Sequence, residues 1–139
     1  MDPEKEVLEV NRRFYQALTD LDLSAMASVW LEESWVRCVH PGWPMLSGWD
    51  DVMESWKRIF DNTAEQRVSP DNVSVQLFGE IAWVLCLERI TSTSSAGRLV
   101  SFAQGTNLFL ATAAGWRMVL HHASVLPVTR PPKSKMTVH

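Results

Sequence analysis

The chain has 139 residues, of which 46% are hydrophobic and 21% are charged, a composition typical of a folded globular protein rather than a disordered one. Its formal net charge of −3 offers no basic surface for nucleic acid or anionic lipid, and it contains no run of about 18 apolar residues that could span a membrane. We therefore expect one domain over residues 1–127, a flexible tail over 128–139, and neither a nucleic-acid partner nor a membrane partner.

Three helices are predicted in the first half of the chain. Apolar side chains recur at helical spacing over residues 4–19, which indicates a helix with one buried face. Asp22 can cap a second helix that continues to about Trp30. Ser47 and Asp50 have the spacing of a capping box, and this predicts that a third helix begins at that point.

An irregular segment separates the second and third predicted helices. Residues 34–39 alternate as a short strand, and residues 38–49, CVHPGWPMLSGW, then combine two prolines, two glycines, two tryptophans and a histidine. Proline fixes φ and lacks an N–H group, so this segment cannot be regular. We interpret it as the lip of a pocket, with His40 and Trp43 at the opening.

Four long strands are predicted after residue 65, over about 66–78, 80–93, 98–112 and 115–126. Short turns connect them, which requires antiparallel pairing. Pro70 should lie on a sheet edge or at a bulge, and Gly105 at a bulge or bend. Helices followed by strands indicate the α+β class.

The sheet is expected to form a homodimer through one face. Residues 81–87 and 108–111 are apolar on both sides of their strands, yet three helices can cover only one face of a four-stranded sheet. A second copy of the chain is the simplest cover for the other face. The alternative is a sheet that curls strongly enough to cover itself.

The order of elements, together with FYQALTDLDLSAMASVW, LSGWDDVMESWKRIF and GWRMVLHHASVLP, resembles the NTF2-like superfamily over residues 4–127. Within it, the chain is similar to the SnoaL-like group and to the association domain of the calcium/calmodulin-dependent protein kinase II type. This resemblance implies an NTF2-like (cystatin-like) cone, in which three N-terminal helices pack on a curved antiparallel sheet and pairs of subunits associate through the sheet. The superfamily includes cyclases, isomerases, dehydratases, transport factors and oligomerisation modules, so the fold alone does not select an activity.

The chemistry of the steroid isomerases of this fold is not expected here. Those enzymes use a carboxylate base with a tyrosine and a protonated aspartic acid as oxyanion hole. Their tyrosine falls near Phe14 and their base near Cys38, and Tyr15, one position further along the helix, is expected to point elsewhere. Glu88 alternates with Arg89 on a long strand, so one of the two could face the cavity, but an exposed cross-strand ion pair is the simpler interpretation.

The candidate site is expected inside the cone. On the last strand, Trp116, Met118, Leu120, His122 and Ser124 share a face, and if that face is the inner one, the cavity is apolar with a few polar groups. His40 and His122 are the candidate acid/base residues, although His122 could be a buried histidine bonded to backbone and His40 part of a rigid turn. The candidate ligand-binding residues are Trp43, Trp56, Asn107 and Trp116.

No metal and no cofactor are expected. His121 and His122 are adjacent on a strand and point to opposite faces, and His40 with one of them leaves no third ligand. Cys38 and Cys86 lie in apolar contexts and fit buried, reduced thiols in the cytoplasm. The charged N-terminal segment also predicts that there is no secretory signal.

Two functions remain open from the sequence. The first is a pocket protein that binds a small apolar or aromatic molecule, with acid/base chemistry of the isomerase, cyclase or dehydratase type. The second is an association module without catalysis. An open cavity rimmed by His40 and Trp43 favours the first, whereas a cavity filled by Trp30, Trp56 and Trp83 favours the second.

Overall fold

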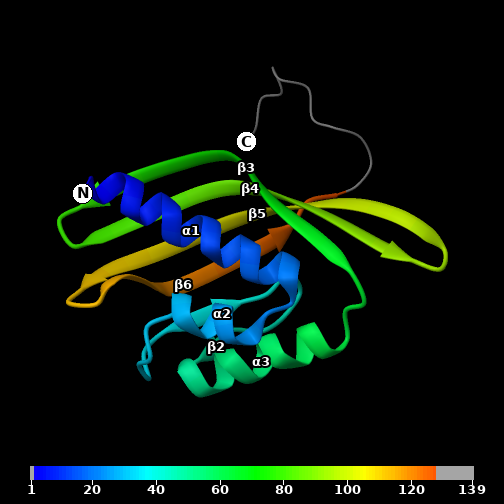
Figure 1. The fold of residues 1–139 in the computed structure, drawn as a ribbon, viewed down its shortest axis with the longest axis horizontal. Coiled ribbons are helices and arrows are strands. Elements are labelled where there is room, and N and C mark those ends of the chain that lie inside the picture. The colour runs from blue at the N-terminus through cyan, green and yellow to red at the C-terminus, as the bar shows by residue number, and fades with distance from the viewer. Residues whose placement is uncertain (1, 128–139) are drawn as a thin grey trace.

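The computed structural model describes residues 2–127 of the chain. In chain order the elements are α1 (Pro3–Asp20), α2 (Leu23–Val29), β1 (Arg37–Val39), β2 (Leu46–Ser47), α3 (Trp49–Asp61), β3 (Gln66–Phe78), β4 (Ile81–Ser94), β5 (Gly97–Thr112) and β6 (Gly115–Val125). The predicted three helices and four long strands are confirmed, and the α+β class with them (Figure 1). The tail predicted over 128–139 lies outside the described residues.

The helix ends follow from local capping, with one exception. Asp22 caps α2 as predicted, because its carboxylate accepts a hydrogen bond of 3.0 Å from the Ala25 N–H. The predicted capping box at α3 is wrong, since Gly48 is the N-cap and no side chain bonds to the helix end. Ser47 instead pairs with Arg37 in the short β1–β2 ladder, which removes it from the helix end.

The six strands form one sheet in the order β2-β1-β6-β5-β4-β3 (Figure 1). The long strands pair antiparallel, while β1 runs parallel to β6. Pro70 lies on the edge strand β3, next to a register shift between Asp71 and Ser74, as predicted. The parallel pairing places Cys38 opposite His121 and thereby brings the proline-rich segment beside the last strand.

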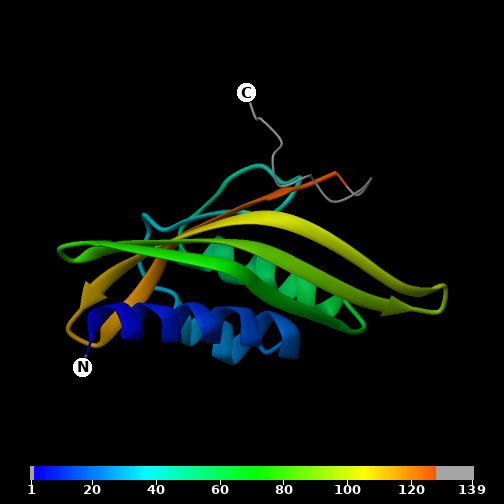
Figure 2. The same ribbon diagram turned by 90° about the horizontal axis from the view of Figure 1, so that it is seen from above.

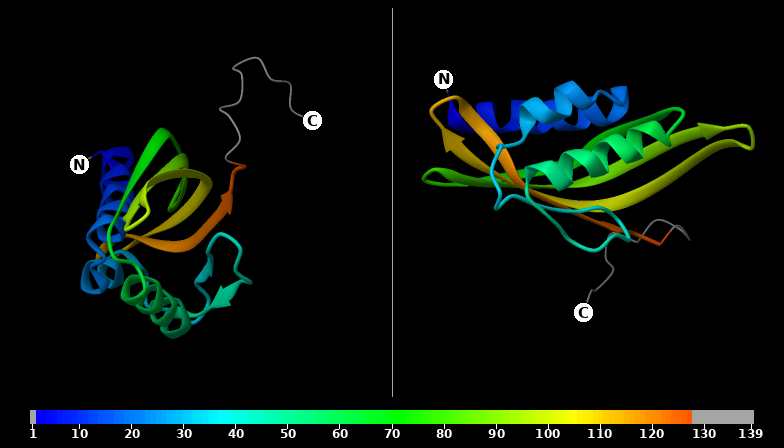
Figure 3. Two further views of the ribbon diagram at one scale, coloured as in Figure 1. Left: turned by 90° about the vertical axis from the view of Figure 1, so that its right-hand side faces the viewer. Right: turned by 90° about the horizontal axis from the view of Figure 1, so that it is seen from below.

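The sheet is bent, and the helices lie on its inner side. Figure 2 shows β4 and β5 curving along their length above α1, and Figure 3 shows α2 and α3 on the same side of the sheet as α1. The buried side chains between the helices and the sheet include Phe14, Trp56, Phe109 and Met118. This is the expected arrangement of helices on one face of a curved antiparallel sheet.

A bulge in β6 reverses the alternation of its side chains. Leu108 pairs with Leu120 whereas the next residue, Phe109, pairs with Met118, so Val119 is an extra residue. Met118 and His121 are therefore both buried, and His122 is exposed. The expectation that Trp116, Met118, Leu120, His122 and Ser124 share one inner face is wrong beyond Met118 for this reason.

The centre of the outer face of the sheet, on β4 and β5, is apolar, and no described helix covers it. The residues of β4 that point to the inner face, among them Ala82, Val84 and Cys86, are buried. On the outer face, Ile81 and its partner Phe78 at the β3–β4 turn keep 39% and 58% of their surface exposed. The same outer face carries five half-buried apolar side chains on β4 and β5, namely Trp83, Leu85, Leu87, Leu108 and Leu110. Homodimerisation through this face stays a prediction.

None of the helices within residues 2–127 combines the length and the apolar character that crossing a membrane would require.

Candidate functional site

A cavity of about 220 Å³ lies behind the proline-rich segment, at the open end of the curved sheet. Its floor is formed by fully buried side chains and its mouth by half-buried ones. The floor consists of Leu18, His40, Trp56, Val68, Glu88 and His121, and the mouth of Pro41, Trp43, Ile59, Gln66 and Ile90. The segment predicted as a lip thus lines this cavity through His40, Pro41 and Trp43.

Edge-to-face contacts between aromatic rings hold the lip in place. The Trp43 N–H donates to the His40 carbonyl oxygen at 2.9 Å, which closes a turn around Gly42 at φ 82°. The His40 ring packs edge-on between Trp43 and Trp56, with centroid separations of 4.9 and 4.4 Å. The two rings thereby fix His40 at the wall of the cavity.

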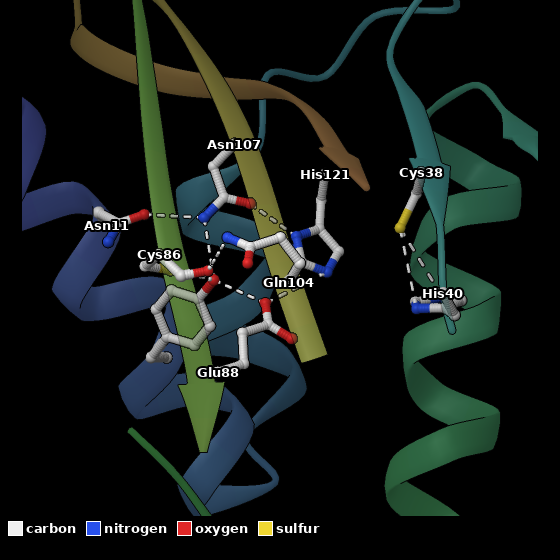
Figure 4. A network of polar contacts seen from close by, with 9 residues as sticks. Asn11, Cys38, His40, Cys86, Glu88, Gln104, Asn107 and His121 are labelled. Carbon is white, nitrogen blue, oxygen red and sulfur yellow. Dashed lines mark hydrogen bonds and ion pairs between the residues drawn. The ribbon is translucent and has the colours of Figure 1, made fainter. Parts of the chain in front are cut away.

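A network of buried polar side chains, shown in Figure 4, reaches the floor of the cavity through Glu88 and His121. The Tyr15 hydroxyl donates to Glu88 Oε2 at 2.7 Å, and Asn107 Nδ2 donates both to the Tyr15 oxygen at 3.1 Å and to Asn11 Oδ1 at 2.9 Å. His121 Nδ1 lies 2.6 Å from Asn107 Oδ1. The network joins α1, β4, β5 and β6, so it ties the helix to three strands.

Glu88 is the central residue of this network, a position that the sequence left open but did not favour. Its side chain is buried on the inner face of β4, and Arg89, on the opposite face, donates to Asp71 at 2.7 Å instead. The interpretation as a Glu88–Arg89 surface pair is therefore wrong. The available signal was the alternation in β4, because Glu88 continues the buried series Ala82, Val84 and Cys86.

The prediction that Tyr15 points elsewhere is also wrong. Helix α1 packs against the inner side of the bent sheet and also contacts α2, so that more than one of its faces is covered. Phe14 and Tyr15 are therefore both buried. Asn11 and Tyr15 are four residues apart and share the face of α1 that meets the network. The spacing of these two polar side chains in a buried helix was the signal for this face.

Gly105 allows the Glu88 carboxylate to approach β5. No register shift occurs at Gly105, and the expected bulge lies at Leu108/Phe109 instead. A Cβ at Gly105 would stand 2.6 Å from Glu88 Oε2 and 3.0 Å from the Tyr15 hydroxyl. The glycine is thus required for the close contact between strand and carboxylate rather than for a bend.

Burial sets the protonation states of the floor. Burial raises the pKa of Glu88 from 4.5 to about 7, although the Tyr15 hydrogen bond opposes the shift. Burial lowers the pKa of His40 to about 4, and burial together with His40 and His122 lowers the pKa of His121 to about 3. At neutral pH both imidazoles are therefore uncharged, and Glu88 exchanges its proton readily.

The hydrogen bonds define the tautomers of the two histidines. Asn107 Nδ2 donates twice, so its Oδ1 is the acceptor and His121 Nδ1 carries the proton. The lone pair of His121 Nε2 then lies 4.0 Å from Glu88 Oε2, a contact between neutral imidazole and carboxyl rather than an ion pair.

His40 has the opposite tautomer. Ser55 Oγ donates to the Val52 carbonyl at 2.6 Å, so His40 Nε2 donates to Ser55 Oγ at 2.8 Å and leaves Nδ1 as an acceptor. Cys38 Sγ lies 3.8 Å from Nε2 and 3.9 Å from Nδ1 of this ring. Burial raises the pKa of Cys38 far above its usual value, which keeps it a thiol rather than a nucleophilic thiolate.

The structure brings only some of the predicted site residues together. His40, Trp43 and Trp56 line the cavity, and Asn107 lies behind it, bonded to His121. Trp116 is buried in the core and is not among the lining residues. His122 is exposed, because the bulge at Val119 turns it outwards, and His121 takes the inner position in its place.

Two further observations concern possible ligands. The Trp56 indole N–H is buried and has no hydrogen-bond acceptor among residues 2–127. In the same part of the chain, no three or more His, Cys, Asp or Glu side chains are grouped to hold a metal ion.

A second hollow of about 300 Å³ lies between α1 and β3, away from the polar network except at Tyr15. Arg12, Gln16 and Arg67 at its rim are exposed, and Arg12 is already paired with Glu9 at 2.8 Å. An exposed ion pair of this kind contributes little, and the hollow brings no buried ionisable pair together. The cavity at Glu88 is the stronger candidate.

Comparison with known proteins identifies relatives of the whole described fold. The sequence pattern of the SnoaL-like domain family matches residues 7–129. Among solved structures, a proposed dehydratase of the NTF2-like family from Streptomyces avermitilis is 33% identical with a TM-score of 0.83, and the match covers 90% of this chain and 96% of that one.

Two further structures belong to association modules. A proposed calcium/calmodulin-dependent protein kinase type II association domain from Thiobacillus denitrificans is 29% identical with a TM-score of 0.77, covering 85% of this chain and 93% of that one. The CaMKII hub of S. rosetta is 25% identical with a TM-score of 0.76, covering 91% and 98%. The resemblance to these groups is confirmed.

A curated relative, the F-box protein SKIP8 of Arabidopsis thaliana, is 28% identical over 122 residues, which are 88% of this chain. The match covers 50% of that protein, so the chain spans about half the length of this curated relative.

Proposed function

The chain belongs to the SnoaL-like domain family, with an NTF2-like (cystatin-like) fold, and from this premise we propose that its cavity binds a small molecule and that Glu88 and His121 transfer a proton to or from it. The observation that carries the proposal is the position of these two side chains. A carboxyl group that exchanges its proton near neutral pH lies 4.0 Å from an imidazole nitrogen with a free lone pair. Such a pair can protonate one atom of a ligand while it deprotonates a neighbouring one.

The size of the cavity supports a small ligand. A cavity of about 150 Å³ in another protein accommodates benzene. The cavity here has about 220 Å³, which suits a single ring with a short substituent. Its walls are aromatic or aliphatic except for a few polar groups at the floor and Gln66 at the mouth, a composition common to small-molecule sites.

The supporting residues orient the acid and the base. Asn107 holds the His121 ring through Nδ1, so that the lone pair of Nε2 faces Glu88. The Tyr15 hydroxyl fixes the Glu88 carboxyl by donating to Oε2. Proton abstraction next to a carbonyl group is a step shared by isomerase, cyclase and dehydratase reactions, and a similar protein of 33% identity is itself a proposed dehydratase.

Deuterium exchange tests the proposal without knowledge of the natural substrate. Acetophenone has a single ring and exchangeable hydrogens next to its carbonyl, and NMR can follow their replacement in D₂O. We expect the protein to accelerate the exchange, and Glu88→Gln and His121→Gln each to remove the acceleration. The matched control is His122→Gln, because His122 neighbours His121 but is exposed on the other face. Equal acceleration by all four proteins would contradict the proposal.

Self-association is the second candidate function, and the apolar outer face of the sheet favours it. This face carries half-buried leucine and tryptophan side chains on β4 and β5, and two similar structures are an association domain and a hub. A dimer through this face leaves the cavity free, because the cavity lies on the side of the helices. The two functions are therefore compatible.

We also propose a cytoplasmic location. Cys38 and Cys86 are both free and buried, which supports a reducing compartment.

A further inference from the structure

We propose that the ligand of this cavity carries a basic nitrogen, bound as an ammonium group beside Glu88, with its apolar body against the aromatic wall of His40, Trp43 and Trp56. This inference rests on the proposed function, since it requires that the cavity admits a small molecule. It adds the charge of that molecule, which neither the fold nor the acid–base pair specifies.

The charge of the lining residues carries the argument. Eleven residues line the cavity, and Glu88, His40 and His121 are the ionisable ones. Burial keeps both imidazoles neutral, since the pKa of His40 is lowered to about 4 and that of His121 to about 3. The charge available to a ligand is therefore the negative charge of Glu88. An anionic ligand would be repelled by it, and a cationic ligand would be attracted.

Glu88 has no cationic partner within the described part of the chain. Its Oε2 accepts a hydrogen bond from Tyr15, and the nearest basic group is the neutral His121 ring at 4.0 Å. The neighbouring arginines are engaged elsewhere, Arg89 with Asp71 and Arg58 over the outer Trp43 ring at 5.9 Å. Buried carboxylates are normally paired, so an ammonium group from a ligand would supply the missing partner.

The aromatic wall suits the same ligand. Indole and imidazole rings stand around the cavity, and the negative faces of aromatic rings attract cations. A single-ring amine fits both the carboxylate and the aromatic rings within about 220 Å³.

The binding of an ammonium group is linked to a proton. Burial raises the pKa of Glu88 to about 7, so below neutral pH the empty site holds a proton that an ammonium ligand must displace. Affinity for the amine should be constant above pH 8 and fall about tenfold for each pH unit below 7. The ionisable groups that face Glu88 from the surrounding elements are Tyr15, Cys38, His40, Cys86 and His121. None of these is charged between pH 6 and 8, because burial raises the pKa values of the phenol and thiols and lowers those of the imidazoles.

Three probes of nearly equal size test the inference: benzylamine, benzyl alcohol and benzoate. Calorimetric titration at pH 8 should give benzylamine an affinity about tenfold or more above that of benzyl alcohol, with benzoate the weakest. At pH 6 the benzylamine affinity should be lower, and two buffers with different ionisation enthalpies should reveal the release of a proton. Glu88→Gln should bring benzylamine down to the level of benzyl alcohol, while His122→Gln should leave all three affinities unchanged.

The outcomes separate this inference from the proposed function. If benzyl alcohol or benzoate binds more tightly than benzylamine, the cavity admits ligands but the inference is overturned. If none of the three binds, both are overturned. A benzylamine preference that survives in Glu88→Gln also overturns the inference. Should that variant fail to fold, the pH dependence of benzylamine binding to the wild-type protein tests the inference instead. An affinity that is equal at pH 6 and pH 8 contradicts a role for Glu88.

Discussion

The Glu88 carboxylate lies directly against the backbone of Gly105, so close that a Cβ on that residue would stand 2.6 Å from Glu88 Oε2. Real Cβ atoms do not approach an oxygen this closely, so any side chain at this position must displace the carboxylate or the strand. The contact couples a backbone feature of β5 to the acid of the candidate site on β4.

Gly105→Ala is expected to disturb both stability and site geometry. The added methyl group overlaps Glu88 Oε2 and crowds the Tyr15 hydroxyl at 3.0 Å, and overpacking of this kind destabilises proteins by about 1–3 kcal/mol. Urea unfolding measures the loss. The double variant Gly105→Ala/Glu88→Ala should recover part of it, because the overlapping carboxylate is then absent. An unchanged midpoint in the single variant would show that the contact is not tight in solution.

Tyr15→Phe should raise the pKa of Glu88 further. The Tyr15 hydroxyl donates to Glu88 Oε2 at 2.7 Å, and this bond lowers the pKa against the effect of burial. Carbon-13 NMR of the labelled Glu88 carboxyl group, followed as a function of pH, reports the change. We also expect a loss of about 1–2 kcal/mol in unfolding free energy, because a buried hydrogen bond is removed. A pKa that stays unchanged or falls would contradict the assigned direction of the hydrogen bond.

The stability of the protein should be greatest near pH 6.5. The two imidazoles have pKa values lowered from 6.5 to about 4 and about 3 in the folded state, so their contribution is lost as pH falls below 6.5. The Glu88 pKa is raised from 4.5 to about 7, so its contribution is lost as pH rises through this range. Between pH 4.5 and 6.5 the two histidines make the protein more stable as pH rises, and Glu88 makes it less stable. The free energy of unfolding should therefore rise by about 1 kcal/mol per pH unit over this range.

Urea unfolding at several pH values measures this slope, and two variants assign it. His121→Gln should flatten the slope below pH 6.5, and Glu88→Gln should steepen it. His122→Gln serves as the control, since that side chain is exposed. A stability that increases steadily from pH 6.5 down to pH 5 would contradict the lowered histidine pKa values.

The chain should form a dimer that Leu85→Lys dissociates. Leu85 is half-buried at the centre of the outer sheet face, opposite Thr106 on β5, where a charge would be desolvated by a second copy. Light scattering coupled to gel filtration measures the mass, and thermal unfolding shows whether each monomer remains folded. Ser24→Lys is the matched control, because Ser24 is exposed on α2, which lies on the other side of the sheet (Figure 3). A wild-type protein that elutes as a monomer at micromolar concentration would refute the dimer.

The regular elements were accessible from local sequence patterns. The period of apolar residues changes from helical to alternating after residue 65, and the turns at Gly79, Gly97 and Gly115 separate the strands that the structure contains. Asp22 was recognisable as a cap because its side chain accepts a hydrogen bond from the backbone N–H of Ala25, only three residues further along the chain. These features depend on neighbours in the chain, and so the sequence alone predicts them.

The lip of the cavity was also accessible, because prolines and glycines between residues 41 and 48 exclude a regular element. His40, Trp43 and Trp56 accordingly line the cavity. Their proximity to the acid–base pair could not be foreseen, since it depends on the parallel pairing of β1 with β6, between segments about 80 residues apart.

The sequence by itself determined the α+β class, the order of the elements and the irregular lip, because these follow from periodicity, turn residues and capping over short distances. Only the tertiary structure decided which polar side chains meet. A single extra residue at Val119 exchanges His121 for His122 on the inner face, and the bend of the sheet around α1 encloses Tyr15 and Glu88. Burial then sets their charges, and burial depends on packing between distant segments rather than on any local pattern.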